Sequence, residues 1–445
     1  MHHANAEVAG TAAAAAMGVN ERVGTMLVGV GPAGLGLLTA AYAAGELPAL
    51  ADLGMLVVDA EATPGGGNLL NYGVRSDSAA TVFLECVEPL LEAAQLQQAP
   101  ELRRISELPP FDSADLPLVG RLLQAAGKAI IDIARGYGVS VETCTRVTDV
   151  QPASAGGAVV TLTGPNGTRR VRADRLFLAP GGDPYVPEGY RASSAGRVCH
   201  SDVLLRRATF EEAYARLPAQ PSILVLGRAH SAFSAADRLL ADPRSTDWRS
   251  GAVTVAARGP VRVTYLSLEE AEADGVSPHP DDICPNTGRV FRLAGLRGDG
   301  ARRYRLARER VDQRLTIGQL TDTQMLTAAR HADLVIAATG FRSASLRLLP
   351  AGYAIDPDGS VLDPKGCRVP GVWSLGLGSG WRRSDGMGGE PSYTGPIDGV
   401  WHYQSVVAAA LLSAAFPHRE NKKAPVSVSA GRRPGGRCWV RTNVG

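Results

Sequence analysis

Cysteine is scarce in this sequence, and no two cysteines are paired by their spacing. Six cysteines are spread over 445 residues, and none forms a CxxC motif. A disulfide framework, a zinc ribbon and a dithiol redox centre are therefore disfavoured. His200 beside Cys199 is isolated, and His279 with Cys284 is only a weak pair. We predict no metal site, because the spacings typical of His and Cys ligands are missing.

Long apolar runs and an excess of one charge are missing as well. No apolar stretch reaches the roughly 18 residues that a membrane span needs. The formal net charge is only +2, from 46 basic and 44 acidic residues, which gives no reason to expect a nucleic-acid partner. With 45% hydrophobic and 20% charged residues, the composition predicts a globular, cytoplasmic protein with a sizeable core. We expect no membrane partner, and the oligomeric state is left open.

The two ends differ in composition from the rest of the chain. Residues 1–20 are rich in alanine and lack the early Lys or Arg of a signal peptide. Residues 417–445 are basic and contain several Pro and Gly residues. Such compositions do not support a packed core, so we predict a disordered tail at each end.

A glycine-rich turn follows the first apolar strand predicted in the chain. Residues 25–28 form that strand, and residues 29–34 read GxGxxG. A helical stretch comes next, and a second strand at 55–58 ends at Asp59. Strand, turn, helix, strand and acid together are the context that a dinucleotide-binding βαβ unit requires.

The turn residues have distinct predicted roles in such a site. Gly29 and Gly31 allow a tight turn and a close approach to a pyrophosphate, and Gly34 allows the helix to pack closely on the strand. The helix N-terminus supplies partial positive charge. Asp59 is predicted to accept a hydrogen bond from a ribose hydroxyl. The other predicted contacts in this turn are Pro32 and Ala33.

A glycine triplet at residues 65–67 follows Asp59. Together with the first turn, it resembles the two-dinucleotide-binding-domain flavoproteins, in which an acid after the second strand precedes a Gly pair beside FAD. The resemblance implies that FAD is the cofactor of this first site and that Gly66 and Gly67 contact it.

Residues 139–173 have the alternation that is typical of β-strands. Asn166 and Gly167 in this stretch are a strong signal for a hairpin turn. We therefore predict a β-meander inserted into the first domain. Val147 in the meander and Gly181 just after it are two further predicted FAD contacts.

Two similar segments indicate two nucleotide-binding domains. Residues 173–181 and 332–340 both begin with Ala-Asp, continue with mostly apolar residues and end in Gly. In the flavoproteins that this chain resembles, such "ATG" strands close each nucleotide-binding domain. Thr339 and Gly340 match that pattern, whereas Pro180 stands where Thr is usual.

A second strand–turn–helix lies between these two segments. Residues 222–226 predict a strand, and the following turn resembles the NAD(P)H-binding GxGxSA turn, with Gly227 and Ser231 as predicted contacts. Ala229 stands where the second glycine is usual, and its methyl group would crowd a pyrophosphate. Either the turn binds the nicotinamide cofactor, or the second domain is vestigial.

A basic residue follows the next predicted strand. Arg258 stands at this point, where Asp is usual in NADH-binding domains. An Arg here suits the 2′-phosphate of NADPH, with Arg262 as an assisting residue. The alternative is that both are solvated arginines.

The reaction is indicated by a partial match to monooxygenases. Residues 196–201 resemble the GxxxHS segment of Baeyer–Villiger, flavin-containing and N-hydroxylating monooxygenases, without its flanking aromatics. Residues 333–341 resemble the acid-then-ATGY/F segment of the N-hydroxylating group. The missing cysteine pair removes the disulfide-reductase branch, and no Walker, HExxH or GxSxG motif occurs.

The end of the globular part resembles the final FAD strand of the same flavoproteins. Gly376 and Gly378 are its predicted contacts, with Leu377 in place of the usual Asp. The loop 381–393 fits either a substrate wall or a plain surface loop. Asp398 precedes the last predicted helix and is also a predicted cofactor contact, because a helix N-terminus favours the negative charge of a reduced flavin.

Taken together, these features predict an α/β protein with two Rossmann-like dinucleotide-binding domains, the second inserted in the first, plus a β-meander. The FAD domain is predicted at 21–217 and 346–416, and the NAD(P)H-binding-like domain at 218–345. The favoured function is an FAD-dependent monooxygenase that uses NADPH and O2 on a small molecule of specialised metabolism. The alternatives are an FAD oxidase or dehydrogenase with a vestigial second domain, and a non-catalytic flavin-binding scaffold. No catalytic residue is assigned, since the flavin performs the hard chemistry in such enzymes.

Overall fold

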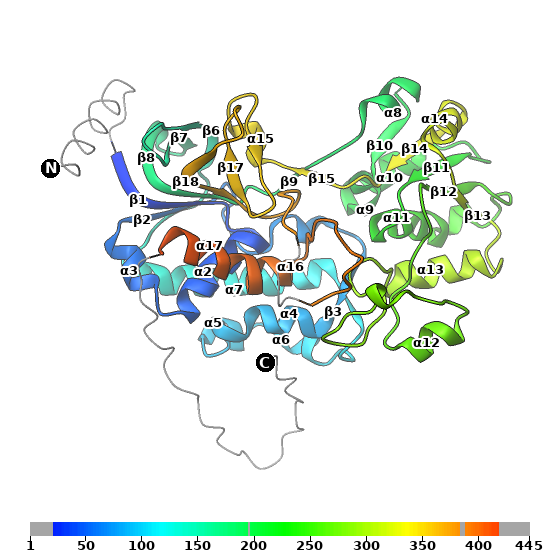
Figure 1. The fold of residues 1–445 in the computed structure, drawn as a ribbon, viewed down its shortest axis with the longest axis horizontal. Helices are drawn as coiled ribbons and strands as arrows, with labels where there is room; N and C mark the ends of the chain where they lie inside the picture. The colour runs from blue at the N-terminus through cyan, green and yellow to red at the C-terminus, as the bar shows by residue number, and fades with distance from the viewer. Residues whose placement is uncertain (1–20, 195, 383–387, 418–445) are drawn as a thin grey trace, which may run out of the picture.

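The computed structural model describes residues 21–194, 196–382 and 388–417, so the predicted tails lie outside the described residues except for residue 417. Figure 1 shows two lobes connected by the pair of strands β9 and β15. Each lobe contains a sheet with parallel strands and flanking helices. The predicted α/β class with two dinucleotide-binding-type domains is confirmed.

A parallel sheet forms the centre of the first domain. Its strands run in the order β18-β8-β1-β2-β5, and each neighbouring pair is parallel. Their bounds are β1 (Glu21–Val28), β2 (Met55–Val58), β5 (Ser140–Glu142), β8 (Gly167–Leu178) and β18 (Arg368–Ser374). Two short antiparallel strands, β16 (Ala354–Ile355) and β17 (Ser360–Leu362), extend the β18 edge. Because Val28 pairs with Val58, the first glycine turn and Asp59 leave the sheet side by side.

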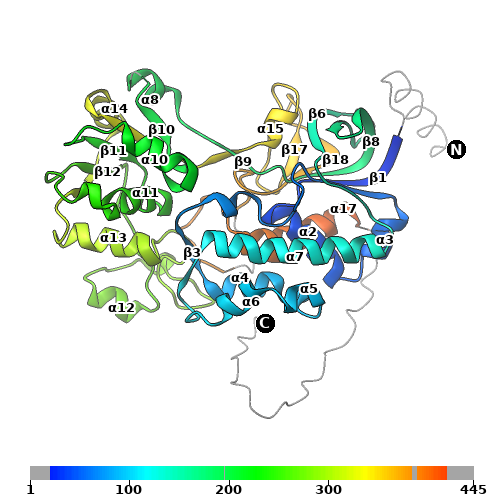
Figure 2. The same cartoon turned by 180° about the vertical axis from the view of Figure 1, so that it is seen from behind.

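Helices cover one face of this sheet. Leu27 and Phe177 of the strands pack there against α2 (Pro32–Ala43), α7 (Leu116–Gly136) and α17 (Ala408–Ala415). Figure 2 shows α7 running along this face, in front of α2 and α17 in this view. The 21-residue α7 buries Leu118, Leu122 and the residues that follow at helical spacing, which explains why this stretch is a helix. The smaller helices of this domain are α3 (Leu47–Asp52), α4 (Ala80–Val87), α5 (Ala94–Gln97) and α6 (Pro100–Ser106).

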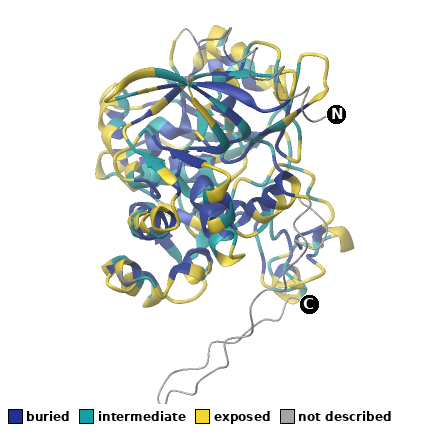
Figure 3. Cartoon of the chain, turned by 90° about the vertical axis from the view of Figure 1, so that its left-hand side faces the viewer, coloured by how far each residue is buried: buried dark blue, intermediate teal, exposed yellow. Residues whose placement is uncertain are grey.

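The predicted meander covers the opposite face. β6 (Arg146–Pro152) and β7 (Ala158–Gly164) form an antiparallel ribbon with β8. Gly164 pairs with Gly167, so the two-residue turn is Pro165-Asn166, one residue before the predicted Asn166-Gly167. Met26, Val28 and Leu56 face this side of the sheet and pack against the ribbon. They alternate along the strands with the residues that face the helices. Figure 3 shows buried residues concentrated in the strands and in the inward faces of the helices.

The second domain has a five-stranded parallel sheet. Its order is β10-β14-β11-β12-β13. The bounds are β10 (Val198–His200), β11 (Ile223–Leu226), β12 (Val253–Ala257), β13 (Leu315–Gln319) and β14 (Leu334–Ala337). Residues of α11 (His230–Ala241) and α13 (Gly298–Arg308) share one core cluster, while α8 (Glu188–Ser193) and α14 (Asp322–His331) share another. The remaining helices are α9 (Ser201–Leu205), α10 (Arg207–Ala215), α12 (Leu268–Ala273) and α15 (Ser345–Leu348).

The chain crosses between the domains through two paired strands. β9 (Gly182–Pro184) leads out of the first domain and pairs in antiparallel fashion with β15 (Phe341–Ser343), which leads back. β10 already belongs to the second sheet, since Val198 pairs with Val335 of β14. The predicted start at residue 218 is therefore too late, because a three-residue strand shows no alternation in the sequence. We place the start of the second domain near residue 185 and keep its end near residue 345 as a proposal.

Three further segments complete the structure. β3 (Arg75–Ala79) and β4 (Ser113–Asp115) form a small antiparallel pair on the side of the first domain that faces the second. The final helical segment begins with α16 (Val400–His402) and passes through a π-helical turn at Tyr403–Val407 into α17. Among the described helices, none is both long and apolar enough to cross a membrane.

Candidate functional site

The first glycine turn has the geometry of a phosphate cradle. Gly29 has φ +86°, and a Cβ there would collide with the carbonyl oxygen of Ala179. A Cβ on Gly34 would collide with the carbonyl oxygen of Gly29. At Gly31, by contrast, a Cβ would meet no atom within 4 Å. The outer two glycines thus serve the protein's own packing, and Gly31 leaves open space at the N-terminus of α2, where a pyrophosphate fits.

Other predicted FAD contacts lie against the same turn. The Gly65 N–H donates to the Val30 carbonyl at 2.6 Å. A Cβ on Gly67 would lie 2.9 Å from Cδ of Pro32, and one on Gly376 would lie 3.3 Å from Cβ of Ala33. The glycine triplet, which includes Gly66, and the final FAD strand therefore both lie against the start of α2. More than 300 residues separate the triplet from that strand in the sequence.

Asp59 is held by the turn that it was predicted to serve. Its carboxylate oxygens accept hydrogen bonds from the backbone N–H groups of Val30 at 2.5 Å and Glu61 at 2.7 Å. Burial raises the pKa of Asp59, and these two hydrogen bonds oppose that rise. The ribose contact remains a prediction, and the structure adds a second role, because the carboxylate fixes the backbone between β1 and α2.

Val147 and Gly181 occupy different surroundings. The Val147 side chain is buried in the core beneath the meander. Just before it, the Thr145 N–H donates to the Asp59 carbonyl at 2.9 Å, which places the start of β6 beside the predicted ribose end. Gly181 has φ +91° with open space around a Cβ, and its carbonyl accepts from the Ala344 N–H at 3.0 Å. It therefore lies at the crossover between the domains.

The resemblance expects an Asp at position 377, which is Leu in this chain. Asp398, 21 residues further along, brings a carboxylate next to this position. Asp398 accepts hydrogen bonds from the Gly378 N–H at 3.1 Å and the Tyr403 hydroxyl at 2.6 Å. The Tyr403 hydroxyl also lies 2.7 Å from the Gly376 carbonyl oxygen. Burial raises the pKa of Asp398, which these two hydrogen bonds oppose. Asp398 thus brings a carboxylate to the turn of the final FAD strand.

The π-helical turn adds a residue that the sequence did not single out. The Gln404 side-chain amide donates to the Pro32 carbonyl at 2.8 Å, and its own oxygen is buried without a protein partner. A Cβ on Gly36 would lie 2.7 Å from the backbone of Gln404, so the last helix packs directly on α2. An unsatisfied acceptor next to the open cradle fits a site that binds a polar ligand.

The second glycine turn repeats the first with one difference. Gly227 has φ +139°, and a Cβ there would lie 2.7 Å from the Ala338 carbonyl oxygen. Ala229 caps α11 with φ −100° and ψ −178°, close to the φ −69° and ψ −172° of Gly31 before α2. Ala229 is exposed, so its methyl group projects from the position where the first turn has open space.

The predicted contacts around this second turn lie at two places. Ser231, in the first turn of α11, lines a large cavity between the domains. Thr339 and Gly340 lie at the crossover instead: the Thr339 hydroxyl donates to the Tyr185 carbonyl, and the Gly340 carbonyl accepts from the Tyr185 N–H at 3.1 Å. Their part in cofactor binding stays a prediction.

Arg258 forms an ion pair that the sequence did not reveal. Its Nε donates to Asp322 at 2.6 Å, and both side chains are largely exposed. Arg228 of the second glycine turn donates to the carbonyl of Pro260, two residues after Arg258, at 3.2 Å. Arg262, expected to assist, is instead directed to Asp282 at 3.7 Å and to the Phe291 ring. An exposed ion pair contributes little to the stability of the fold. A phosphate can therefore compete with Asp322 for Arg258.

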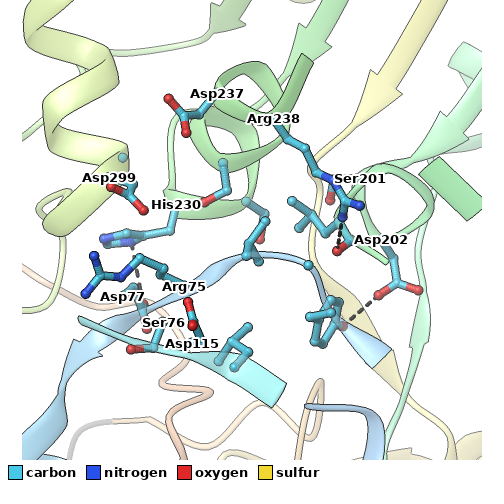
Figure 4. A pocket seen from close by; sticks show the side chains of 18 of the residues that line it. Arg75, Ser76, Asp77, Asp115, Ser201, Asp202, His230, Asp237, Arg238 and Asp299 are labelled. Atoms are coloured by element: carbon cyan, nitrogen blue, oxygen red, sulfur yellow. Dashed lines mark hydrogen bonds and ion pairs between the residues drawn. The ribbon is translucent and has the colours of Figure 1, made fainter. Parts of the chain in front are cut away.

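A cavity of about 660 Å³ lies between the two domains. Residues 72–77 and 115–117 of the first domain form one wall, and residues of α9, α10 and α11 form the other. Leu377, between the two FAD-strand glycines, also lines it. The cavity therefore begins at the predicted flavin end and extends along α11. In Figure 4, His230, Asp299 and Asp77 lie on one side of this view, and Arg238, Ser201 and Asp202 lie on the other.

An ionic cluster closes one end of the cavity. His230 Nε2 accepts from the Arg297 N–H at 2.8 Å, which leaves the proton on Nδ1, and Nδ1 lies 3.6 Å from Asp77 of the first domain. Arg297 also lies 3.6 Å from Asp77. Burial lowers the pKa of His230, with Asp77 opposing that effect. At neutral pH the imidazole is therefore neutral and bridges the domains.

His200 of the monooxygenase-like segment has a structural role. Its Nδ1 accepts from the Asp202 N–H at 3.1 Å and caps α9, and its Nε2 lies 2.9 Å from the Gly340 carbonyl. Both ring nitrogens are thus used by the backbone. Of the loop 381–393, Trp381 packs in the core of the first domain, whereas Glu390 accepts from the Leu293 and Ala294 N–H groups of the second domain; none of the described loop residues lines the cavity. Among the described residues, no cluster of His, Cys, Asp or Glu forms a metal site.

Comparison with solved structures shows the same fold. No family model matches the chain. The FAD-bound cadaverine monooxygenase of Erwinia amylovora aligns with a TM-score of 0.57 at 14% identity, covering 94% of this chain and all of that one. The L-lysine 6-monooxygenase of Pseudomonas syringae aligns with a TM-score of 0.54 at 18% identity, covering 89% of this chain and all of that one.

A curated relative is similar in sequence over nearly the whole chain. The CMP-5'-(3-aminopropyl)phosphonate hydroxylase of Streptomyces rubellomurinus is 33% identical over 432 residues, which span 88% of this chain and 96% of the relative. This chain therefore belongs to the family of that hydroxylase, and it shares the fold of the two monooxygenases named above.

Proposed function

We propose that this protein is an FAD-dependent monooxygenase that uses NADPH and O2 to hydroxylate an amine on a small molecule. The observation that carries the proposal is the connection at Leu377. This residue lies between the two glycines of the predicted FAD strand, and it also lines the cavity between the domains. A flavin held at the first glycine turn would therefore face the same space that α11 and its nicotinamide-type turn border.

The chain's own residues bind and orient the cofactor. Gly31 leaves room for the pyrophosphate at the N-terminus of α2. Asp59 fixes this turn, and Asp398 fixes the turn of the final strand through the Gly378 N–H. Bound FAD would supply the two-electron and oxygen chemistry that no side chain provides.

The overall reaction balances without a further reactant. NADPH and a proton supply two electrons and two hydrogens, one oxygen atom of O2 enters the substrate as a hydroxyl group, and the other leaves as water. A cytoplasmic location belongs to the same proposal, because NADPH is supplied there.

An amine is favoured over a ketone as the substrate group. The relative is named for an aminopropyl substrate, and the two solved structures are named for cadaverine and L-lysine. Asp115 and Asp299 add carboxylates to the cavity wall near Asp77. Carboxylates at this end would attract a cationic ammonium group.

One observation favours a second candidate. The Ala229 methyl group projects where the first turn leaves space, so it would weaken the binding of a pyrophosphate at α11. A protein in which this domain no longer binds NADPH would be an FAD oxidase or dehydrogenase that takes electrons from its substrate.

Isotope labelling tests the proposed function. Purified FAD-loaded protein is incubated with NADPH, ¹⁸O2 and a panel of primary amines that includes CMP-5'-(3-aminopropyl)phosphonate, cadaverine and lysine. The proposal predicts one ¹⁸O atom in the product of at least one amine. Oxidised product that carries no ¹⁸O, together with H2O2 formation in the absence of NADPH, would support the oxidase instead.

A further inference from the structure

Two arginines on the second-domain wall of the cavity have no acidic partner. Arg207 begins α10, and Arg238 lies in the third turn of α11. Both line the cavity. Within the described residues, neither side chain comes within ion-pair distance of a carboxylate, whereas Arg297 at the other end of the cavity pairs with Asp77.

Arg238 is held in a fixed position. One of its guanidinium nitrogens donates to the Leu205 carbonyl at 2.6 Å, and the guanidinium lies 4.3 Å from the centre of the Phe210 ring. The backbone of Gly73 lies on its other side, since a Cβ there would meet this guanidinium at 2.7 Å. One of five N–H donors is used in this way, so the others are free for a ligand.

Without a bound anion, the positive charges of Arg207 and Arg238 repel each other. Burial lowers the pKa of Arg238, and the nearby charge of Arg207 lowers it further. Glu211, which opposes this effect, is already paired with Arg244 at 3.0 Å. The three carboxylates at this end of the cavity are also engaged, in the pairs Asp202–Arg206, Asp237–Arg303 and Asp242–Arg244.

We propose that Arg207 and Arg238 bind a phosphate or phosphonate group of the substrate. This inference rests on the proposed function, which makes the cavity the substrate site. The planar guanidinium with several parallel donors matches the oxygens of a phosphoryl or phosphonyl group and forms charge-assisted hydrogen bonds with them. The substrate would then lie along α11, with its anionic group at Arg238 and its amine towards the carboxylates near His230.

NADPH also carries phosphates, but they have other places in the structure. Its pyrophosphate belongs at the N-terminus of α11, and Ser231 there precedes Arg238 by seven residues, about 10 Å along the helix. Its 2′-phosphate belongs at Arg258, at the end of β12. The pair Arg207 and Arg238 is therefore left for the substrate. The relative's name, which contains a phosphonate, agrees with this choice.

Binding of a simple probe tests the proposal. Titration calorimetry on the FAD-loaded protein, without NADPH or O2, measures the affinity for 3-aminopropylphosphonate, with propylamine as the matched probe that lacks the anion. The variants are Arg207→Gln and Arg238→Gln. Arg216→Gln, at the residue that follows the last residue of α10, is the control, because Arg216 pairs with Glu212 and does not line the cavity. Arg207 makes no hydrogen bond within the described residues, so its variant should fold even if Arg238→Gln does not.

We expect the phosphonate to bind more tightly than propylamine, and each cavity variant to weaken phosphonate binding about 10- to 150-fold. The control and the affinity for propylamine should not change. Rising salt should weaken phosphonate binding. Unchanged phosphonate affinity in Arg207→Gln would overturn the proposal. So would a loss confined to the rate of flavin reduction by NADPH, since that would assign the pair to the nicotinamide cofactor. Because the titration needs no turnover, it remains informative if the monooxygenase assignment fails.

Discussion

His230 of the second domain directs its Nδ1 at Asp77 of the first domain, 3.6 Å away. The two residues are 153 positions apart in the sequence. His230 begins the helix of the second glycine turn, and Asp77 lies on the small strand β3. The contact ties the nucleotide-type turn of one domain to the wall of the other, at the edge of the cavity.

The first prediction concerns the titration of His230. Burial lowers its pKa, and the Asp77 charge counteracts that lowering. Replacing Asp77 by Asn should therefore lower the pKa of His230 further. Carbon-13 labelling of the eight histidines, with the His230 signal assigned through His230→Gln, measures it by NMR. An unchanged or higher His230 pKa in Asp77→Asn would show that the contact does not form in solution.

Gly31 and Gly34 of the first turn should respond differently to substitution. A Cβ at Gly31 would meet no protein atom within 4 Å, so we expect Gly31→Val to keep the stability of the FAD-free protein. It should weaken FAD binding about 10- to 150-fold for each charge-assisted hydrogen bond that is lost. Gly34→Ala should instead destabilise the fold by about 1–3 kcal/mol, because its methyl group collides with the Gly29 carbonyl. Urea unfolding and FAD titration of both variants check this, and normal FAD affinity in Gly31→Val would refute the cradle.

Arg258 and Asp322 provide a paired test of nicotinamide selectivity. If Arg258 binds the 2′-phosphate, Arg258→Ala should slow flavin reduction by NADPH and leave reduction by NADH unchanged. The side chain is exposed, so the expected loss is about 1 kcal/mol, or roughly fivefold. Asp322→Asn removes the competing carboxylate and should improve NADPH use. Stopped-flow reduction with both cofactors measures these effects, and equal losses for NADPH and NADH in Arg258→Ala would assign Arg258 to the fold.

Stability should depend on pH through His402. Burial lowers the pKa of this side chain to about 4, and neither ring nitrogen has a protein hydrogen-bond partner among the described residues. The unfolded chain binds a proton near pH 6.5, whereas the folded protein does so only near pH 4, so stability falls as pH falls between these values. The loss amounts to at most about 3 kcal/mol. Chemical unfolding at several pH values should show a weaker dependence in His402→Leu, and an identical slope would contradict this origin.

Local patterns in the sequence predicted much of the fold. The three glycines around α2, the hairpin at Asn166-Gly167 and the apolar strands before Asp59 and Arg258 all depend on neighbouring residues, which is why they could be found. The short strand β10 could not, because three residues give no periodic signal. The predicted boundary at residue 218 was too late for this reason.

The contacts that build the cavity join distant parts of the chain. Asp398 next to Leu377, Asp322 next to Arg258 and Asp77 next to His230 each require a crossover or a turn that brings separate elements together. Sequence spacing carries no information about such pairs. The unpaired arginines Arg207 and Arg238 became visible only when the neighbouring carboxylates were seen to be engaged by other cations.

The most direct test of the central claim is anaerobic mixing of the FAD-loaded protein with NADPH, in the presence and absence of candidate amines. The account predicts loss of the visible absorbance of oxidised flavin, faster with NADPH than with NADH, and its return when O2 is admitted. Absence of reduction by either nicotinamide cofactor, with reduction by an amine alone, would contradict it. Ala229 would then be the residue that abolishes nicotinamide binding, and the protein would be an oxidase.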